Sequence, residues 1–337
     1  MKTYLITGGA GFVGSHFVRF LHGTEKDALI INVDKLTYSG SMENFKSIKS
    51  SKRHIFYRAD ICCEDILEKL YERHKPDTVV NFAAESHVDR SIEKSSKFIR
   101  TNVEGLRVML DLSVKYGVER FMQISTDEVY GPIDEGSFSE KACLNPTNPY
   151  SASKAAGDLL ALSYKHTHGL PVVVTRSANN FGENQHSEKL IPKTIENALS
   201  LKKIPIYGEG RQVREWIYVN DHCGALLDIV NNFKQGEIYN ISSGFELENI
   251  ELVKILLRKI SKKLNVSDLR AKEINEGLLD FVEDRKGHDF RYSIRGDKLK
   301  KDTGWKPTYD FENAIERTVD WHLSRQSKNG ESNENSL

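Results

Sequence analysis

The stretch Thr7-Gly8-Gly9-Ala10-Gly11-Phe12-Val13-Gly14 decides the fold of this 337-residue chain. An apolar run at residues 4–7 leads into it, and residues 12–21 continue from it with helical spacing. Glycines permit a tight turn and close approach of the backbone to a pyrophosphate, and the following helix N-terminus offers free N–H groups and a favourable dipole. The stretch predicts a dinucleotide-binding turn; the alternative is a glycine-rich turn without a ligand.

A carboxylate near the end of the next apolar run indicates which dinucleotide would bind. Asp34 follows the strand-like residues 28–33 and stands 20 residues after Gly14. A carboxylate at this place can accept from both hydroxyls of an adenosine ribose and repels a 2′-phosphate. This position favours NAD over NADP, although the neighbouring Lys35 weakens the preference slightly.

The remainder of the first half alternates strand-like and helix-like segments. We expect strands near residues 54–59, 78–82, 121–125 and 172–175, and helices near 64–74, 94–116 and 150–168. Such alternation predicts an α/β protein, a doubly wound parallel sheet of the NAD-binding Rossmann type. We assign residues 1–178 and about 219–245 to that domain, residues 179–218 and 246–325 to a smaller interleaved substrate domain, and the polar residues 326–337 to a disordered tail.

Composition excludes several other classes of protein. Lys plus Arg and Asp plus Glu number 48 each, so there is no basic excess for nucleic acid. No apolar run approaches the ~20 residues that cross a membrane. The four cysteines form neither a CxxC pair nor a zinc-like spacing with histidine, so we expect reduced thiols in a cytoplasmic protein and no metal site.

Two motifs supply groups for acid–base chemistry. Tyr150 and Lys154 are four residues apart, on one face of a helix, where the lysine charge should lower the tyrosine pKa. The same spacing recurs at Tyr71 and Lys75, which we interpret as a solvated helix end at the other edge of the sheet.

Thr126, Asp127 and Glu128 end the fifth expected strand, at the edge where α/β sheets bind ligands. Two carboxyl groups in a closed site can divide into acid and base; the alternative is a solvated acidic turn. Asp60, Ile61 and residues 83–86 follow other strands at the same edge, where ligand contact and ordinary loop structure are equally compatible with the sequence.

Together these motifs resemble the extended short-chain dehydrogenases/reductases that act on nucleotide sugars, and most closely the dTDP-glucose 4,6-dehydratases. The resemblance runs from about residue 1 to 323. It is carried by the segments 7–14, 34–38, 84–91, 125–131, 149–154 and 188–192, and the Thr126-Asp127-Glu128 triplet distinguishes these enzymes from related epimerases.

The resemblance implies that bound NAD transiently oxidises C4 of the hexose while C6 loses its hydroxyl as water. Thr126 and Tyr150 would contact the C4 hydroxyl, Asp127 would be the acid and Glu128 the base, with Lys154 completing the catalytic set. The product would be a 4-keto-6-deoxy sugar nucleotide.

The family pattern also implies two binding sets. The cofactor set comprises Gly8, Gly11, Phe12, Val13, Gly14, Asp34, Lys35, Thr37, Asp60, Ile61, Ala83, Ala84, Ser86, Tyr150 and Lys154. The substrate set comprises Ser86, His87, Thr126, Asn179, Glu188, Lys189, Arg214, Asn249, Arg285 and His288. Arg214 and Asn249 would bind the pyrophosphate, and Arg285 and His288 would close the site.

Several alternatives stay open. Ala178, Lys286 and Phe290 depart from the family pattern in the substrate lobe, so UDP-glucose and UDP-N-acetylglucosamine compete with dTDP-glucose. A 4-epimerase and a non-catalytic NAD-binding regulator are the other functional hypotheses. By analogy with the family we expect a homodimer, formed through the helices near 94–116 and 150–168, and a role in surface-glycan precursor synthesis.

Overall fold

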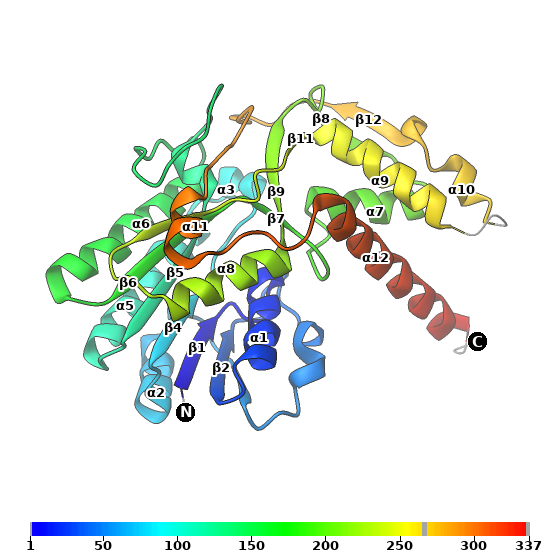
Figure 1. Ribbon diagram of the computed structural model, residues 1–337. Coiled ribbons are helices and arrows are strands. Elements are labelled where there is room, and N and C mark those ends of the chain that lie inside the picture. The colour runs from blue at the N-terminus through cyan, green and yellow to red at the C-terminus, as the bar shows by residue number, and fades with distance from the viewer. Residues whose placement is uncertain (1, 265–267, 335–337) are drawn as a thin grey trace.

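The computed structural model describes residues 2–264 and 268–334. Among these residues, the largest sheet has seven strands in the order β10-β6-β5-β4-β1-β2-β3, and each neighbouring pair is parallel (Figure 1). The strands are β1 (Lys2–Thr7), β2 (Ala28–Asp34), β3 (His54–Arg58), β4 (Thr78–Asn81), β5 (Arg120–Thr126), β6 (Val172–Ser177) and β10 (Ile238–Ile241). The predicted α/β class with a doubly wound parallel sheet is confirmed.

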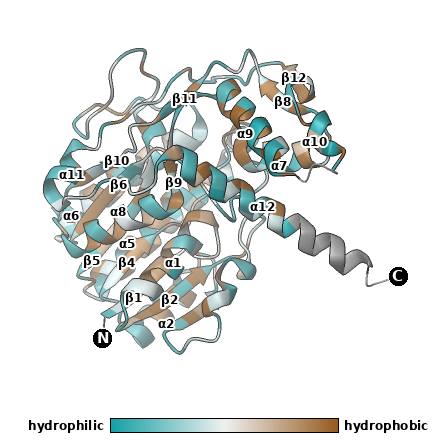
Figure 2. Ribbon diagram, turned by 45° about the vertical axis from the view of Figure 1, so that its right-hand side comes forward, coloured by the Kyte–Doolittle hydropathy of each residue, from teal (hydrophilic) through white to brown (hydrophobic). Residues whose placement is uncertain are grey.

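Helices cover both faces of this sheet because alternate strand residues point to opposite sides. Tyr4 and Ile6 of β1 pack in one apolar core with Phe17 of α1 (Phe12–Thr24), whereas Leu5 packs in a second core with Leu67 of α2 (Glu64–His74). The first core also receives α8 (Val219–Asn231), and the second receives α5 (Leu106–Lys115) and α6 (Pro149–His168). In Figure 2 the strands of the large sheet are largely hydrophobic, and the helices around them carry both hydrophobic and hydrophilic residues.

A smaller set of elements lies beyond the carboxyl edge of the large sheet (Figure 1). One sheet has the order β11-β9-β7, and a two-stranded sheet pairs β12 with β8. The elements are η3 (Asp127–Tyr130), β7 (Asn179–Phe181), α7 (Leu190–Leu199), β8 (Ile204–Tyr207), β9 (Val213–Tyr218), β11 (Glu246–Glu248), α9 (Asn249–Lys263), α10 (Arg270–Glu273), η4 (Glu276–Leu278) and β12 (Leu279–Val282). Two other elements belong to the body of the large sheet: η1 (Met42–Ile48) lies in the β2–β3 connection, and α11 (Asp297–Thr303) packs beside β10, where Lys298 Nζ donates to the Ile238 carbonyl oxygen at 2.5 Å.

The helix expected near residues 94–116 is interrupted. It consists of α4 (Ser96–Ile99), a π-helical turn η2 (Arg100–Gly105) and α5, and α3 (Val88–Glu93) precedes it. The π-turn carries Asn102, whose side chain accepts from the Glu85 backbone N–H at 2.9 Å and donates to Ser153 Oγ at 2.8 Å. The widened turn therefore ties the loop after β4 to α6, in keeping with the usual occurrence of π-turns near functional sites.

The expectation of a disordered tail over residues 326–337 stays a prediction. Helix α12 runs from Phe311 to Glu334, and only 335–337 of the expected tail lie outside the described residues. Phe311, Ile315 and Val319 are buried in the body of the protein and anchor the first turns. Elongation of an established helix adds a hydrogen bond for each residue fixed, so polar residues can continue it.

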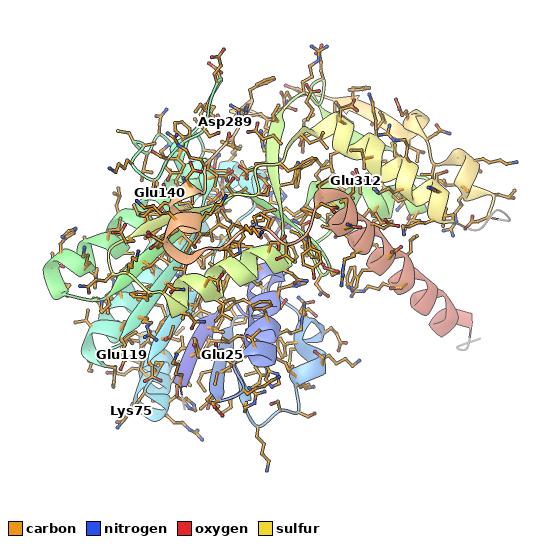
Figure 3. All side chains as sticks on the ribbon, viewed as in Figure 1. Glu25, Lys75, Glu119, Glu140, Asp289 and Glu312 are labelled. Carbon is orange, nitrogen blue, oxygen red and sulfur yellow. The ribbon has the colours of Figure 1, made fainter. Side chains whose placement is uncertain are left out.

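The two edges of the large sheet differ in what they carry. Figure 3 shows Glu25, Lys75 and Glu119 at the amino-terminal edge of the strands and Asp289 on the opposite side. The second Tyr/Lys pair thus lies away from the ligand edge, as expected, but the interpretation of Tyr71 as solvated is wrong. Tyr71 is fully buried and its hydroxyl lies 3.0 Å from Ser113 Oγ, because it faces α5 across the core.

A buried ion pair connects α6 to β6 beneath the ligand edge. Arg176 Nε donates to Asp158 Oδ2 at 2.9 Å, and both side chains are almost completely buried. The guanidinium also donates to the Tyr130 hydroxyl, which in turn donates to Asn240. The pair therefore joins α6, β6, η3 and β10 in one hydrogen-bonded group.

We expect Arg176→Met to lower the free energy of unfolding by about 3–5 kcal/mol, since it leaves the Asp158 carboxylate buried without its partner. The double variant Asp158→Asn/Arg176→Met should recover part of this loss because no charge remains. Urea unfolding of the three proteins checks the prediction, and an Arg176→Met loss below about 1 kcal/mol would contradict it.

Candidate active site

The glycine turn between β1 and α1 has the shape that its sequence predicts. Gly8 has φ of 68°, and a Cβ atom there would stand 2.6 Å from the backbone nitrogen of Ala83. A Cβ on Gly14 would stand 2.3 Å from the carbonyl oxygen of Gly8. Only glycine fits either position, so the loop folds closely onto the start of α1 and leaves the first N–H groups of the helix free for a ligand.

Asp34 lies beside this turn, at the end of β2. Its Oδ2 accepts from the Ala10 N–H at 2.9 Å and its Oδ1 accepts from the Leu36 N–H at 2.7 Å. Burial raises the pKa of Asp34, while these N–H donors oppose the rise. Lys35 pairs instead with Asp60, with Nζ 2.6 Å from Oδ2, so its charge is directed away from Asp34.

One cavity collects every residue of the predicted cofactor set and every residue of the predicted catalytic set. It also includes Ser86, Asn179, Glu188 and Lys189 of the substrate set. The cradle of glycines, the free helix N-terminus and the held carboxylate of Asp34 together fit a dinucleotide with unmodified ribose hydroxyls. This chemistry is the reason to regard the cavity as a cofactor site.

The Thr126-Asp127-Glu128 triplet is turned, not extended, so both acids reach the cavity. Thr126 caps η3: its Oγ1 accepts from the Glu128 N–H at 3.3 Å and donates to Asp127 Oδ1 at 3.1 Å. Asp127 Oδ2 is buried without a hydrogen-bond partner in the described residues. The alternative of a solvated acidic turn is therefore wrong.

The two acids differ in their electrostatic surroundings. Burial raises the pKa of Asp127 well above its usual range, and the charges of Glu128 and Glu215 raise it further. Burial also raises the pKa of Glu128, but the cations Arg214 and Lys189 oppose that rise. Asp127 is therefore the better proton donor of the pair and Glu128 the better proton acceptor.

Tyr150 and Lys154 lie on α6 beside the triplet, yet the lysine does not act as the sequence predicts. Burial raises the pKa of Tyr150, and the charge of Glu128 raises it further. A hydrogen bond with Thr126 opposes part of this rise. Lys154 Nζ donates to the Ile124 carbonyl oxygen at 2.5 Å. The expected lowering of the Tyr150 pKa is thus wrong for the protein alone, because desolvation and nearby carboxylates dominate.

A second cavity adjoins the first and gathers the rest of the predicted substrate set. It is lined by His87, Arg214, Asn249, Arg285 and His288, and it shares Glu128, Asn179, Glu188 and Lys189 with the cofactor cavity. The two spaces therefore meet at Glu128. A molecule held in the second cavity can reach the acids and the tyrosine of the first.

Arginines of the second cavity are held by protein acceptors. Arg214 donates to the carbonyl oxygens of Val213 at 2.7 Å and Asp289 at 2.8 Å, so its guanidinium is fixed near the triplet. Arg285 pairs with Asp89 of α3, with Nε 2.5 Å from Oδ1. This pair bridges α3 and the C-terminal segment, and the role of Arg285 in closing the site stays a prediction.

Glu188 and Lys189 occupy the junction between the cavities. Glu188 Oε1 accepts from the Tyr38 hydroxyl at 3.1 Å, and its Oε2 lies 3.1 Å from Arg90. Lys189 Nζ donates to the Ser86 carbonyl oxygen at 3.2 Å, and burial lowers its pKa. Nε2 of His87, the residue before α3, lies 3.7 Å from Oε2 of Glu188, so the loop that carries Glu188 is joined to α3.

Sequence reasoning missed several lining residues. Those of the first cavity include Thr101, Asn180, Gln185, His186 and His222, and those of the second include Tyr207, Gln212 and Tyr292. The adjacency of Asn180 to Asn179 is a signal that was available. His222 lies on α8 with no local motif, so only the tertiary fold brings it to the cavity.

Two further findings concern the described part of the chain. Within it, no cluster of three or more His, Cys, Asp or Glu side chains is arranged to hold a metal ion. Over the same residues, no helix combines the length and the apolar character needed to cross a membrane.

The fold and site define a class of protein. A family model described as GDP-mannose 4,6 dehydratase matches residues 5–318, so the chain belongs to that family. The low-salt glycan biosynthesis protein Agl12 of Haloferax volcanii is 46% identical over 319 residues, 95% of this chain and 98% of its own length. The dTDP-glucose 4,6-dehydratase of Xanthomonas campestris is 42% identical, with 97% and 95% covered.

Solved structures separate two enzyme groups of the same fold. The Streptomyces venezuelae dTDP-glucose 4,6-dehydratase DesIV, solved with NAD and TYD bound, has a TM-score of 0.89 at 42% identity, with 96% of this chain and 98% of that chain covered. A Thermotoga maritima UDP-glucose 4-epimerase, solved with UDP-glucose, has a TM-score of 0.85 at 28% identity, with 96% and 99% covered. Epimerases are therefore the more distant group.

We expect the burial of Lys154 to give a distinct pH dependence of stability. Burial lowers the pKa of Lys154 to about 8 from its ordinary 10.5. Between these values the unfolded chain binds more protons than the folded one, so the free energy of unfolding rises with pH. From pH 7.5 to 10.5, the wild type should gain roughly 3 kcal/mol relative to Lys154→Met in urea unfolding. Parallel pH curves for the two proteins would contradict this assignment.

Proposed function

We propose that this protein is an NAD-dependent nucleotide-sugar 4,6-dehydratase, a hydro-lyase, and that dTDP-glucose is its substrate. The observation that carries the proposal is the placement of Asp127, Glu128 and Tyr150 around one cavity that also contains the glycine turn and Asp34. Dehydration of a hexose needs an acid for the leaving hydroxyl and a base for the neighbouring carbon, within reach of an oxidant. The relatives named dTDP-glucose 4,6-dehydratase support the same reaction.

Asp127 and Glu128 have different roles in the loss of water. Asp127, whose raised pKa keeps it protonated, donates its proton to the C6 hydroxyl as that group departs. Glu128, whose carboxylate is stabilised by Arg214 and Lys189, removes the C5 proton. Glu128 returns its proton to C5 at the end of the reaction, and the proton that Tyr150 takes from the C4 hydroxyl balances the one that Asp127 loses with the water, so no net proton is consumed in a turnover.

Tyr150 and Thr126 act at C4. Tyr150 removes the C4 hydroxyl proton, and Thr126 positions the hydroxyl while it orders η3. Lys154, whose Nζ donates to the Ile124 carbonyl oxygen, supplies a buried positive charge that favours the tyrosinate form of Tyr150, the form that accepts this proton. When bound, NAD supplies the reversible oxidation that makes C5 acidic, with no net redox change over the cycle.

In this proposal the two cavities bind different ligands. Residues 1–178 and about 219–245 hold NAD, and residues 179–218 and 246–325 hold the nucleotide diphosphate. Arg214 and Arg285 are suited to a pyrophosphate by their planar arrays of donors, and Asn249 and His288 line the same space. UDP-glucose and UDP-N-acetylglucosamine are the competing substrates, and the glycan-related name of the Haloferax relative supports a role in glycan precursor synthesis.

A 4-epimerase is the second candidate function, and the likeness of the fold to 4-epimerase structures favours it. Such an enzyme needs the C4 chemistry of Tyr150 but has no use for a protonated Asp127 beside Glu128. The buried acid pair therefore favours the dehydratase.

We also propose a cytoplasmic homodimer. The helices α3–α6 present exposed apolar side chains, with Ile92, Ile99 and Leu159 exposed by 41%, 51% and 60%. Two copies of α5 and α6 packed together would form a four-helix interface and bury these groups. The four cysteines are free thiols, which is typical of a reducing compartment.

The proposed reaction is tested by incubation of the purified protein with dTDP-glucose, UDP-glucose and UDP-N-acetylglucosamine, followed by mass spectrometry. We expect loss of one water from dTDP-glucose. Unchanged mass with altered C4 stereochemistry would favour the epimerase, and no reaction with any of the three would reject both enzymes.

Glu128→Gln should still permit oxidation at C4, seen as NADH absorbance, but should slow water loss by about 10²–10⁴-fold because the base is gone. Glu119→Gln, an exposed glutamate at the opposite edge of the sheet, is the control and should keep full activity. Normal dehydration by Glu128→Gln would remove Glu128 from this role.

The dimer is tested by light scattering after gel filtration. Leu159→Asp should give a monomer, since a charge would be buried at the interface. Leu269→Asp is the matched control, because Leu269 is 78% exposed beside α10, away from α3–α6. A dimeric Leu159→Asp protein would rule out this interface.

A further inference from the structure

His222 is a buried histidine of the cofactor cavity to which the proposed reaction gives no task. It lies on α8, is 1% exposed, and lines the same cavity as Gly8 and Tyr150. Its Nδ1 lies 2.7 Å from Oδ1 of Asn180. Its Nε2 is buried and has no hydrogen-bond partner in the part of the chain that the structure describes.

Asn180 determines which ring nitrogen of His222 carries the hydrogen. The Asn180 amide nitrogen donates to the Ala178 carbonyl oxygen at 3.0 Å and to Ser177 Oγ at 3.2 Å. A carbonyl only accepts, so the amide nitrogen faces Ala178 and the amide oxygen faces His222. An amide oxygen also only accepts, so Nδ1 of His222 is the donor and Nε2 keeps its lone pair. Burial lowers the pKa of His222 to about 3, which keeps the ring neutral.

A second unpartnered acceptor belongs to Gln185, which also contacts Asn180. Gln185 Nε2 donates to the Asn180 backbone carbonyl at 2.8 Å, which leaves Gln185 Oε1 as the free end of the amide. This oxygen is buried without a partner among the described residues, and Gln185 lines both cavities. Two buried acceptors in one place call for a ligand that brings N–H or O–H groups, because buried acceptors in folded proteins are nearly always paired.

The position of these acceptors limits which part of a dinucleotide can satisfy them. Phosphate oxygens only accept hydrogen bonds, so the pyrophosphate is excluded. Asp34, which indicates the place of the adenosine ribose, lies at the end of β2. In the sheet, β2 is four strands away from β6, and at a strand spacing of ~4.8 Å the two strands are about 19 Å apart. Asn180 binds Ser177 at the end of β6, on the side of the catalytic residues, so the nicotinamide riboside half remains.

We propose that His222 is a cofactor-binding residue whose Nε2 accepts a hydrogen bond from the nicotinamide riboside half of NAD, from its carboxamide N–H or a ribose hydroxyl. This inference rests on the proposed function, since it takes NAD as the cofactor. His222 lines the cofactor cavity and not the second cavity, so the base and diphosphate of the sugar nucleotide, proposed to lie in the second cavity, are not its partners.

The first test is NAD affinity, measured by titration calorimetry on the full-length protein after removal of bound nucleotide. His222→Phe should weaken NAD binding about tenfold, because it keeps the ring but removes the acceptor. His222→Gln, which offers an amide oxygen, should recover most of the loss. His322→Phe is the control, and its NAD affinity should stay unchanged. His322 is also buried, and its Nε2 has no hydrogen-bond partner among the residues that the structure describes, but it lines neither cavity.

The two possible donors are separated with 3-acetylpyridine adenine dinucleotide, which lacks the amide N–H groups but retains the ribose hydroxyls. If the carboxamide donates, wild type and His222→Phe should bind this analogue equally. If a ribose hydroxyl donates, the tenfold difference should persist. Either result supports the role of His222 and identifies its partner.

The second test reads the histidine itself and needs no variant that might unfold on substitution. In the ¹⁵N-histidine-labelled wild type, we expect the His222 ring to have hydrogen on Nδ1, and its Nε2 resonance to move when NAD is added. Hydrogen on Nε2, an unmoved Nε2 resonance, or equal NAD affinity of a folded His222→Phe would overturn the inference. Failure of the wild type to bind NAD would instead reject the proposed function.

Discussion

Parallel pairing is the constraint on which this site depends. Because the strands of the large sheet run in one direction, the chain segments that follow β1, β2, β4, β5 and β6 all emerge at one edge. The strand order reverses between β1 and β4, so loops on the two sides diverge and leave a crevice there. Groups as distant in sequence as Gly8 and Ser177 thereby meet in one cavity.

Desolvation then gives the collected groups their chemical character. Asp127 and Glu128 are adjacent in sequence, and burial raises the pKa of both. They differ because Arg214 and Lys189, from outside the large sheet, are the main groups that favour the charged form of Glu128, whereas the charges of Glu128 and Glu215 raise the pKa of Asp127 and Arg214 opposes that rise only weakly. The distinction between acid and base therefore depends on how the two parts of the protein pack, and a single domain would not produce it.

A feature of this structure can be predicted from the sequence when the interactions that create it are local, and cannot when they are made across the fold. The glycine turn, Asp34 and the Tyr150–Lys154 helix depend on neighbouring residues, so their patterns predict their structure. Asn102 in the π-turn and His222 on α8 depend on contacts made across the fold, and no local pattern marks them. Tyr71 has the same spacing to a lysine as Tyr150, yet it is a core residue, because its helix packs on α5 and not at the ligand edge.

The junction of the two cavities has a consequence for substrate choice. Glu128, Glu188 and Lys189 line both spaces, whereas Arg214, Asn249 and His288 line only the second. Substitutions deep in the second cavity can thus alter recognition of the base or diphosphate without contact with the reacting hexose. Lys286 and Phe290, where the sequence departs from the family pattern, are adjacent in sequence to residues that line the second cavity. In the proposed reaction the chemistry falls to the triplet and Tyr150, which line the first cavity, with Glu128 lining the second as well.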